Sequence, residues 1–291
     1  MHLIHRSYVL ALCAALTLAF GAPRTLAAGP PRRIVSAFLC TDEYVFRLVP
    51  RTRIAALSYL AGDTHPVVST IAGQVAGIPL VRASAEEIMS LRPDLVVTYE
   101  NTNSHLLAQL RAAGIPLLEI PWAQSLTDVR RITLMLGDRL NAREHATAML
   151  ATMDANLAMA RSKAVTPPVR TLIYEPNGYL TAGGVSDAVL LAGGLQSIAP
   201  SMHVTRAGTL PVEALLAAPP DILILNDSPE AAPARANLLL RHPALSALKS
   251  MAVHLSLTPL LCPGPWSAAI APKFAQLGHQ ARSLARPRPA P

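Results

Sequence analysis

The sequence predicts an α/β protein of two Rossmann-like lobes with parallel sheets, joined by one long backbone helix, with a ligand cleft between the lobes. Three observations lead to this expectation. Short apolar segments rich in β-formers alternate with helical patterns, a stretch without glycine or proline separates two such series, and one segment occurs twice.

The first half of the chain reads as a series of β/α units. Four short apolar segments are expected strands, at 33–38, 54–57, 95–98 and 116–120. Between them, apolar residues recur at helical spacing over 42–48, 85–91, 103–113 and 125–136. Strands that alternate with helices in this way are typical of parallel sheets.

A long helix and a second β/α series follow. The stretch 142–165 contains no glycine or proline and ends before the prolines at 167 and 168, which cannot continue a helix. Strands are then expected at 170–174, 222–225 and 252–256, with helices at 185–192 and about 267–284. We therefore divide the chain into an N-terminal lobe (28–141), a linking helix (142–166), a C-terminal lobe (167–285) and a proline-rich, disordered tail (286–291).

The first 27 residues resemble a cleaved secretory signal peptide. A basic start, an apolar run at 8–22 and small residues at 27–28 follow one another in the order such peptides require. Leu12 precedes Cys13, whereas a lipoprotein signal needs a small residue there, so we expect no lipid anchor. The protein is expected in the periplasm.

Composition narrows the function classes. The formal net charge is +7, but charged residues are only 15% of the chain and form no dense basic run before the tail, which argues against nucleic-acid binding. Two cysteines, Cys40 and Cys262, remain after signal cleavage. In an oxidising compartment they are candidates for a disulfide, with two unrelated buried thiols as the alternative.

The internal repeat is the most informative feature. Residues 86–97 align without a gap on residues 213–224: each copy has a glutamate, six residues, Pro-Asp and an apolar run. Each copy is expected to form a short helix that stops before proline and a turn that enters a buried strand. One copy in each half predicts two similar lobes and a cleft between them; a generic helix-to-strand joint is the alternative.

Four features together resemble the helical-backbone (class III) periplasmic binding proteins of ABC importers. They are this repeat, the 33–56 opening, the single long helix and the Gly183-Gly184 pair. That family takes up vitamin B12, ferric siderophores and haem. The resemblance implies that Glu86 and Glu213 are exposed carboxylates that pair with arginines of the transmembrane permease. Ordinary solvated acids at helix starts are the alternative.

Candidate ligand-binding residues lie at or beyond the ends of the expected strands, where ligands of open α/β sheets bind. Aromatic residues are only 4% of the chain, yet most of them fall at these positions, where flat rings can hold a bulky chelate. The candidates are Tyr59, Tyr99, Asn101, Trp122, Tyr174, Tyr179 and Trp266. Tyr99 and Tyr59 are the strongest candidates, because Tyr99 resembles a cleft aromatic of the cobalamin-binding relatives and Tyr59 lies in a similar loop.

Naked metal, cofactors and catalysis are not expected. The histidines are scattered without a His-x-His pair, and neither a Gly-x-Ser-x-Gly elbow nor a phosphate-binding loop occurs. We therefore expect no enzyme but a monomeric receptor that delivers a metal chelate to a permease and meets the membrane only through that complex. A ferric siderophore is the leading ligand, with cobalamin or haem as alternatives. A sensor without transport and a periplasmic enzyme are the competing classes.

Overall fold

The computed structural model describes residues 29–65, 67–227 and 235–285. The expected signal peptide and the expected 286–291 tail lie outside the described residues. The chain divides into a unit Met1–Pro30 and a unit Pro31–Pro291, and the description below concerns the second.

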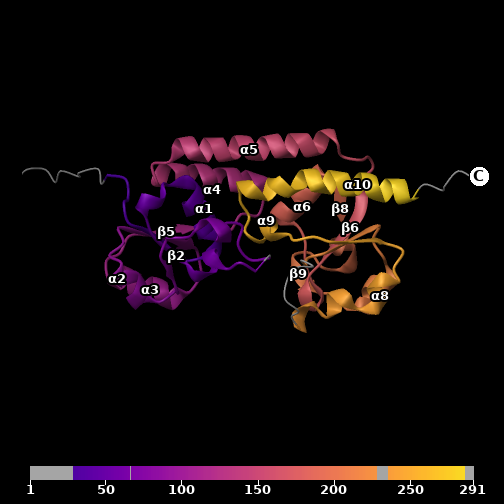
Figure 1. Cartoon of the computed structure of the whole chain (residues 1–291), viewed down its shortest axis with the longest axis horizontal. Coiled ribbons are helices and arrows are strands. Elements are labelled where there is room, and N and C mark those ends of the chain that lie inside the picture. The colour runs from indigo at the N-terminus through magenta and orange to yellow at the C-terminus, as the bar shows by residue number, and fades with distance from the viewer. Residues whose placement is uncertain (1–28, 66, 228–234, 286–291) are drawn as a thin grey trace, which may run out of the picture. The chain divides into compact units, whose positions relative to one another are not determined.

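Two parallel sheets form the framework (Figure 1). The first, the sheet of the N-lobe, has the order β3-β2-β1-β4-β5, and the second, the sheet of the C-lobe, has the order β11-β10-β6-β8. The N-lobe elements are β1 (Ile34–Ser36), α1 (Leu39–Leu48), β2 (Ile54–Ser58), β3 (Leu80–Val81), α2 (Ala85–Ser90), β4 (Leu95–Tyr99), α3 (Ser104–Ala112), β5 (Leu117–Ile120) and α4 (Leu126–Arg139). The linking helix α5 (Arg143–Ser162) follows.

The C-lobe repeats the β/α alternation with one addition. Its elements are β6 (Val169–Tyr174), β7 (Tyr179–Thr181), α6 (Gly184–Ala192), β8 (Leu195–Ser197), β9 (Ala207–Thr209), α7 (Val212–Ala217), β10 (Ile222–Leu225), α8 (Pro243–Ser246), β11 (Met251–His254), α9 (Thr258–Leu261) and α10 (Ala271–Ala285). Strands β7 and β9 pair antiparallel as a separate two-stranded sheet. The two copies of the repeat build α2-β4 and α7-β10. Each of their strands pairs with the strand that comes first along the chain in its sheet, β4 with β1 and β10 with β6.

Strand residues alternate between two apolar layers, as side chains of period two must. In β10, Ile222 and Ile224 join one core, whereas Leu223 and Leu225 join another on the opposite face of the sheet. The first of these cores also contains Ile34 of β1 and Val97 of β4. One core therefore runs from the N-lobe into the C-lobe, and each sheet has a second core of its own on the other face.

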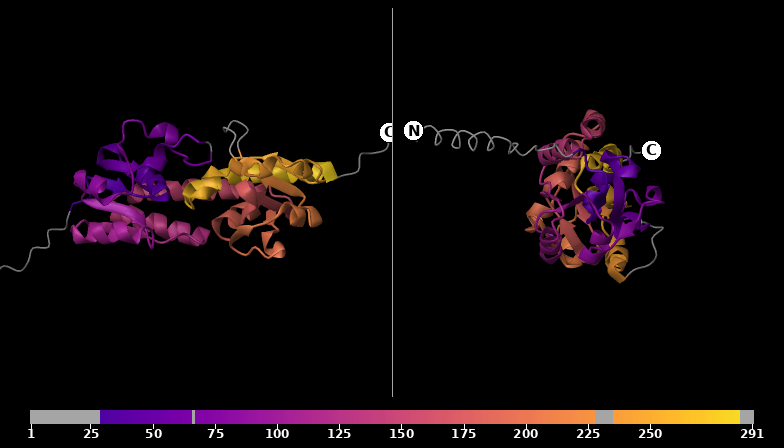
Figure 2. Two further views of the ribbon diagram at one scale, coloured as in Figure 1. Left: turned by 90° about the horizontal axis from the view of Figure 1, so that it is seen from below. Right: turned by 90° about the vertical axis from the view of Figure 1, so that its left-hand side faces the viewer.

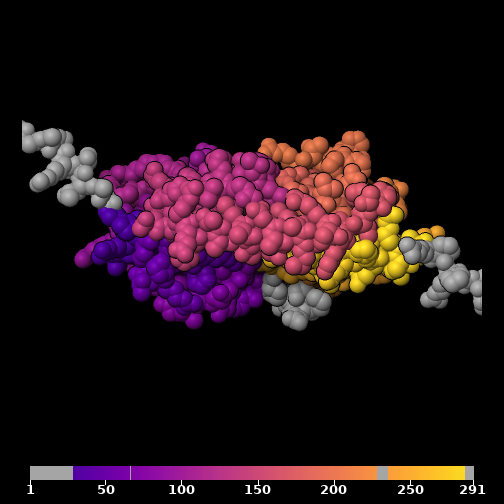
Figure 3. Space-filling view, turned by 90° about the horizontal axis from the view of Figure 1, so that it is seen from above, coloured from indigo at the N-terminus to yellow at the C-terminus, as the bar shows by residue number. Residues whose placement is uncertain are grey.

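Helix α5 accounts for this shared core. It packs against α4 of the N-lobe and against α6 and α10 of the C-lobe, and its buried residues are Ala146, Leu150, Met153, Leu157 and Ala160. Their spacing of three or four residues keeps them on one helical face. Figure 2 shows the indigo-to-purple N-lobe and the orange C-lobe at opposite ends of this helix, and Figure 3 shows its outer surface running along both lobes.

The fold class expected from the sequence is confirmed, with small shifts of boundary. Helix α5 covers residues 143–162 of the expected 142–166. The expected final helix begins with a 3-10 segment, Pro265–Ile270, before α10 continues as an α-helix. No helix in the described part of the chain is both long and apolar enough to cross a membrane. The lobe limits at 141 and 167 remain predictions.

Candidate functional site

A cavity of about 490 Å³ lies between the two lobes. Its walls come from segments that follow strands: 122–124 after β5, Glu175 after β6 and Asn226 after β10. The start of α6, the segment 257–263, Val67 and residues of the β7–β9 pair also line it. The cavity therefore opens where the carboxyl ends of both sheets meet, which is the usual place for a ligand in such sheets.

Trp122 and Tyr179 bring aromatic surface to the cavity from opposite lobes. The Trp122 side chain is 45% exposed and that of Tyr179 is 40% exposed. Val67, Leu260 and Leu261 add apolar surface. Large exposed rings in a concave site are suited to a flat or bulky amphipathic ligand.

Tyr99 supports Trp122 from behind. Its ring centroid lies 5.1 Å from that of Trp122 and 5.3 Å from that of Phe38, and the residue is only 2% exposed. Burial raises the pKa of the Tyr99 phenol above its ordinary value, so the group stays neutral. Tyr99 is thus a backing residue of the cavity wall, and the expectation that it contacts ligand directly is corrected.

The charged residues that line the cavity are Glu175 and Arg206. Thr181 donates a hydrogen bond of 3.4 Å to Glu175 Oε1. Burial raises the pKa of Glu175, and the bond from Thr181 offsets only part of that effect. Its carboxyl group therefore binds a proton more readily than an exposed glutamate does, whereas the Arg206 side chain is exposed.

Two glycines bring the start of α6 to the cavity. Gly183 and Gly184 have φ angles of 79° and 65°, a region that disfavours residues with a Cβ atom. The Gly183 N–H donates to the Asp187 carboxylate at 2.8 Å, which closes the first turn. A Cβ atom on Gly184 would lie 3.7 Å from the backbone oxygen of Gln124, in the other lobe. Gly184 thus lies where the two lobes approach each other at the cavity.

A junction between the lobes closes the cavity behind Pro263. Cys40 of α1 and Cys262 form a disulfide, and the Tyr44 hydroxyl donates to the Pro263 carbonyl at 3.3 Å. The Tyr44 ring meets the edge of Trp266 at 4.7 Å. One face of α1 therefore holds the 262–266 segment by covalent, polar and aromatic contacts.

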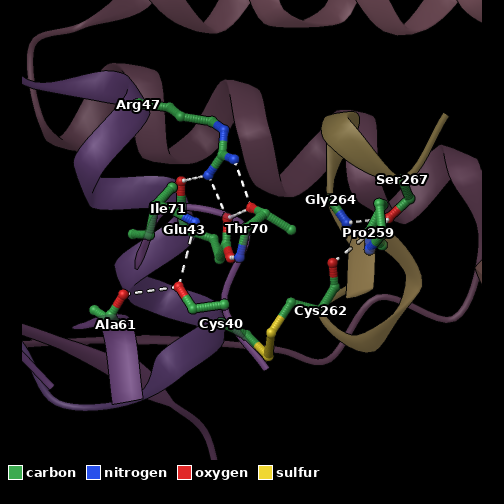
Figure 4. A network of polar contacts seen from close by, with 11 residues as sticks. Cys40, Glu43, Arg47, Ala61, Thr70, Ile71, Pro259, Cys262, Gly264 and Ser267 are labelled. Carbon is green, nitrogen blue, oxygen red and sulfur yellow. Dashed lines mark hydrogen bonds and ion pairs between the residues drawn. A yellow bond between two sulfur atoms is a disulfide. The ribbon is translucent and has the colours of Figure 1, made fainter. Parts of the chain in front are cut away.

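Arg47 ties this junction to a second wall of the cavity (Figure 4). Its guanidinium lies 4.7 Å from the centroid of the Trp266 ring. It also pairs with the buried Glu43 carboxylate and donates to the Thr70 hydroxyl at 2.7 Å. Glu43 in turn accepts the Thr70 N–H at 2.9 Å. The loop that carries Val67 and the segment that carries Pro263 are thus both fixed to α1.

The other expected ligand residues lie elsewhere. Tyr174 is fully buried and its hydroxyl donates to the Leu210 carbonyl at 2.8 Å, so the expectation that it binds ligand is wrong. Trp266 belongs to the junction rather than to the cavity lining. Tyr59 is 54% exposed and Asn101 occupies an exposed turn, but neither is among the residues that line the cavity.

The lining also contains residues that we did not single out. Among them are Val67, Gln124 and the leucines at 257, 260 and 261. Only Gln124 carries a sequence signal, because it directly precedes Ser125, which caps α4 by accepting the Asp128 N–H. The others follow from how distant loops pack.

Glu86 and Glu213 lie in the first turns of α2 and α7, and both are exposed. Neither carboxylate forms a hydrogen bond or an ion pair with any residue that the structure describes. The neighbouring Glu87 differs, because its carboxylate accepts the Arg82 N–H at 2.9 Å. The repeat therefore leaves one unpaired carboxylate on the surface of each lobe.

Within residues 29–65, 67–227 and 235–285, no three histidine, cysteine or acidic side chains gather as a metal site would require.

Comparison with known proteins agrees with this geometry. The family model described as periplasmic binding protein matches residues 79–253. An uncharacterised ABC transporter substrate-binding lipoprotein of Bacillus subtilis, YvrC, is 27% identical over 137 residues, which are 46% of this chain and 42% of that protein. The match thus spans less than half of the relative's length.

Two solved structures have the same fold. The apo form of the periplasmic heme-binding protein RhuT from Roseiflexus superposes with a TM-score of 0.68 at 22% identity, covering 86% of this chain and 98% of that one. An ABC-type Fe3+-hydroxamate transport protein from Saccharomonospora viridis gives a TM-score of 0.63 at 19% identity, covering 87% and 94%. Receptors whose names give different ligands thus share this architecture.

Proposed function

The chain belongs to the periplasmic binding protein family, and from that premise we propose that it delivers a bulky metal chelate, foremost a ferric siderophore, to an ABC importer. The observation that carries this proposal is the cavity between the lobes, with Trp122 and Tyr179 facing it from opposite sides. The ligand binds there without turnover and leaves when the importer accepts it. An extracytoplasmic location fits the family, and a cleaved signal peptide at 1–27 is part of the proposal.

The lining favours a chelate whose metal is already fully coordinated. No histidine, cysteine or methionine is among the residues that line this cavity, so the side chains that usually supply nitrogen or sulfur to iron or cobalt are absent from it. Hydrogen-bonding groups are present instead, in Gln124, Glu175, Thr181 and Asn226. A ferric siderophore needs only such contacts to its organic shell, whereas haem gains from an axial ligand, for which the Tyr179 phenol is the candidate in the lining.

Arg206 gives the proposed site a preference for negative charge. Among the described residues that line the cavity it is the sole basic one, and Glu175 of the same lobe is the residue whose burial favours protonation. Burial thus weakens the one negative charge in the lining while the positive charge of Arg206 remains. An anionic ferric complex would therefore bind better than a cationic one of equal size.

We further propose that Glu86 and Glu213 dock the receptor on its permease. Both are exposed and unpaired among the described residues, and they occupy equivalent positions of the repeat. Individually an exposed ion pair contributes about 0–1 kcal/mol. Two of them, one on each lobe, would fix orientation and register rather than supply most of the affinity.

The test is a fluorescence titration of the Trp266→Phe variant, which retains only Trp122 of the two tryptophans. A ferric hydroxamate, haemin and cyanocobalamin are added separately, and the Trp122→Phe variant serves as the matched control. We expect saturable one-to-one quenching by the ferric hydroxamate, and none of comparable strength in the control. Tight binding of haemin or cyanocobalamin alone would replace the siderophore with that ligand. Chemical conversion of any of the three would refute the receptor role.

A further inference from the structure

Each copy of the repeat is attached to the first strand of its own sheet by an arginine side chain. In the N-lobe, Arg33 Nε donates to the carbonyl oxygens of Leu91 and Arg92, both at 3.2 Å, directly after α2 ends. In the C-lobe, Arg170 Nη1 donates to the Pro219 carbonyl at 3.3 Å, directly after α7 ends. Arg92 and Pro219 are equivalent positions of the aligned repeat.

The backbone repeats the same correspondence. The Asp94 N–H donates to the Arg33 carbonyl at 3.1 Å, and the Asp221 N–H donates to the Arg170 carbonyl at 2.9 Å. These aspartates are the Pro-Asp residues of the two copies. Each arginine thus anchors the turn through its main chain and the end of the helix through its side chain.

Helices α2 and α7 need such an anchor because they are short. Each has six residues and two buried side chains, Ala85 and Ile88 in α2 and Val212 and Leu215 in α7. A helix of this length has few internal hydrogen bonds, and its last carbonyl groups lack partners within the helix. The two guanidinium groups bond carbonyl oxygens of the turns that directly follow these helices, and a positive charge at that end complements the helix dipole.

We propose that Arg33 and Arg170 are positioning residues that hold α2 and α7 in the direction that presents Glu86 and Glu213 to the permease. This inference rests on the proposed docking role of the two glutamates. It explains why Arg33 directly precedes β1 and why Arg170 lies in β6, because each of these strands neighbours the strand that the repeat enters. The docking carboxylates are then fixed relative to the sheets and not only to their own helices.

Both arginines are exposed, so their replacement leaves no cavity in a core. The test measures the affinity of the full-length mature receptor for the detergent-solubilised ABC permease complex of its own organism. The variants are Arg33→Gln, Arg170→Gln, Glu86→Gln, Glu213→Gln and the pairs Arg33→Gln/Glu86→Gln and Arg170→Gln/Glu213→Gln. Arg161→Gln is the matched control, because Arg161 is an exposed arginine outside both joints.

We expect each arginine variant to weaken the complex roughly two- to fivefold, as expected for a change at an exposed ion pair, with unfolding midpoints close to that of Arg161→Gln. Each double variant should bind no more weakly than its glutamate variant alone, because the arginine acts through that glutamate. Additive losses, or normal binding by the arginine variants while the glutamate variants are weakened, would overturn the positioning role. Unchanged binding by the glutamate variants as well would refute the docking role itself.

Discussion

The phenol ring of Tyr99 packs against the indole of Trp122 at 5.1 Å, with the two ring planes inclined by 44°. One ring is almost fully buried and the other is nearly half exposed. The buried ring therefore sets the position of the exposed one at the cavity between the lobes. The contact explains how a residue on β4 can affect ligand binding without touching the ligand.

Two replacements of Tyr99 should show whether its ring supports Trp122 or its hydroxyl contacts the ligand. Tyr99→Ala removes the ring beneath Trp122 and should weaken binding of the ferric hydroxamate roughly tenfold, since aromatic pairs contribute about 0.5–1.5 kcal/mol beyond area burial. Tyr99→Phe keeps the ring and should bind as the wild type does. The titration described above measures both, and equal loss in the two variants would show that the hydroxyl itself contacts the ligand.

The buried Asp42 should make stability depend on pH. Ser58 donates its N–H to Asp42 Oδ1 at 3.1 Å and its hydroxyl to Oδ2. Burial raises the pKa of Asp42 to about 8 from an ordinary 3.8, and the hydrogen bonds from Ser36 and Ser58 offset only part of that rise. The protonated acid is thus favoured in the folded state.

A raised folded-state pKa gives stability that is fully present below the unfolded pKa and is lost as pH rises through the folded pKa. The free energy of unfolding should therefore fall between about pH 4 and about pH 8, by on the order of a few kcal/mol. Asp42→Asn should flatten that slope, because an amide mimics the neutral acid. Urea unfolding at a series of pH values measures both proteins, and an equal slope in the two would contradict the assignment.

Removal of the Cys40–Cys262 disulfide should lower stability strongly. The bond links residues 222 positions apart, and a loop of that length greatly restricts the unfolded chain, with typical stabilisation of about 2–4 kcal/mol. The Cys40→Ala/Cys262→Ala variant should unfold at correspondingly lower denaturant. The affinity for the ligand should change less than the free energy of unfolding does, because Tyr44 and Arg47 still hold the 262–266 segment. A loss of unfolding free energy below about 0.5 kcal/mol would show that the non-covalent contacts of the junction suffice to keep the lobes together.

Gly264 should not tolerate a side chain. A Cβ atom built there would lie 2.4 Å from atoms of the Trp266 ring, which Tyr44 and Arg47 hold from other sides. Gly264→Ala should therefore cost about 1–3 kcal/mol, the range for overpacking. Gly73→Ala is the control, because a Cβ atom there meets nothing within 4 Å. Equal unfolding midpoints for the two variants would mean that the indole moves freely.

The architecture could be predicted because the sequence patterns that indicate it are local and occur once in each lobe. The 86–97 and 213–224 copies form equivalent helix-to-strand joints beside the first strand of each sheet. The short strands β3, β7, β8 and β9 were not predicted. Such strands depend on the neighbour with which they pair rather than on their own composition.

The site was harder to predict because side-chain direction decides it. Tyr174 and Leu172 share one face of β6 and join a core, whereas Ile173 on the other face reaches the cavity. This alternation was readable in principle, but which face of the strand points to the cavity depends on how the lobes pack. Of the expected ligand residues, Trp122 after β5 and Tyr179 at the start of β7 line the cavity, and their contact with a ligand stays a prediction.

Native mass spectrometry of the protein purified from the organism that makes it tests the central claim most directly. The account predicts one small molecule bound to each chain, with the isotope pattern of iron, which is released unchanged on denaturation. Loss of that mass in the Trp122→Ala variant would place it in the cavity. A protein that carries no ligand when isolated from iron-limited cells, or that releases a chemically altered product, would contradict the assignment as a chelate receptor.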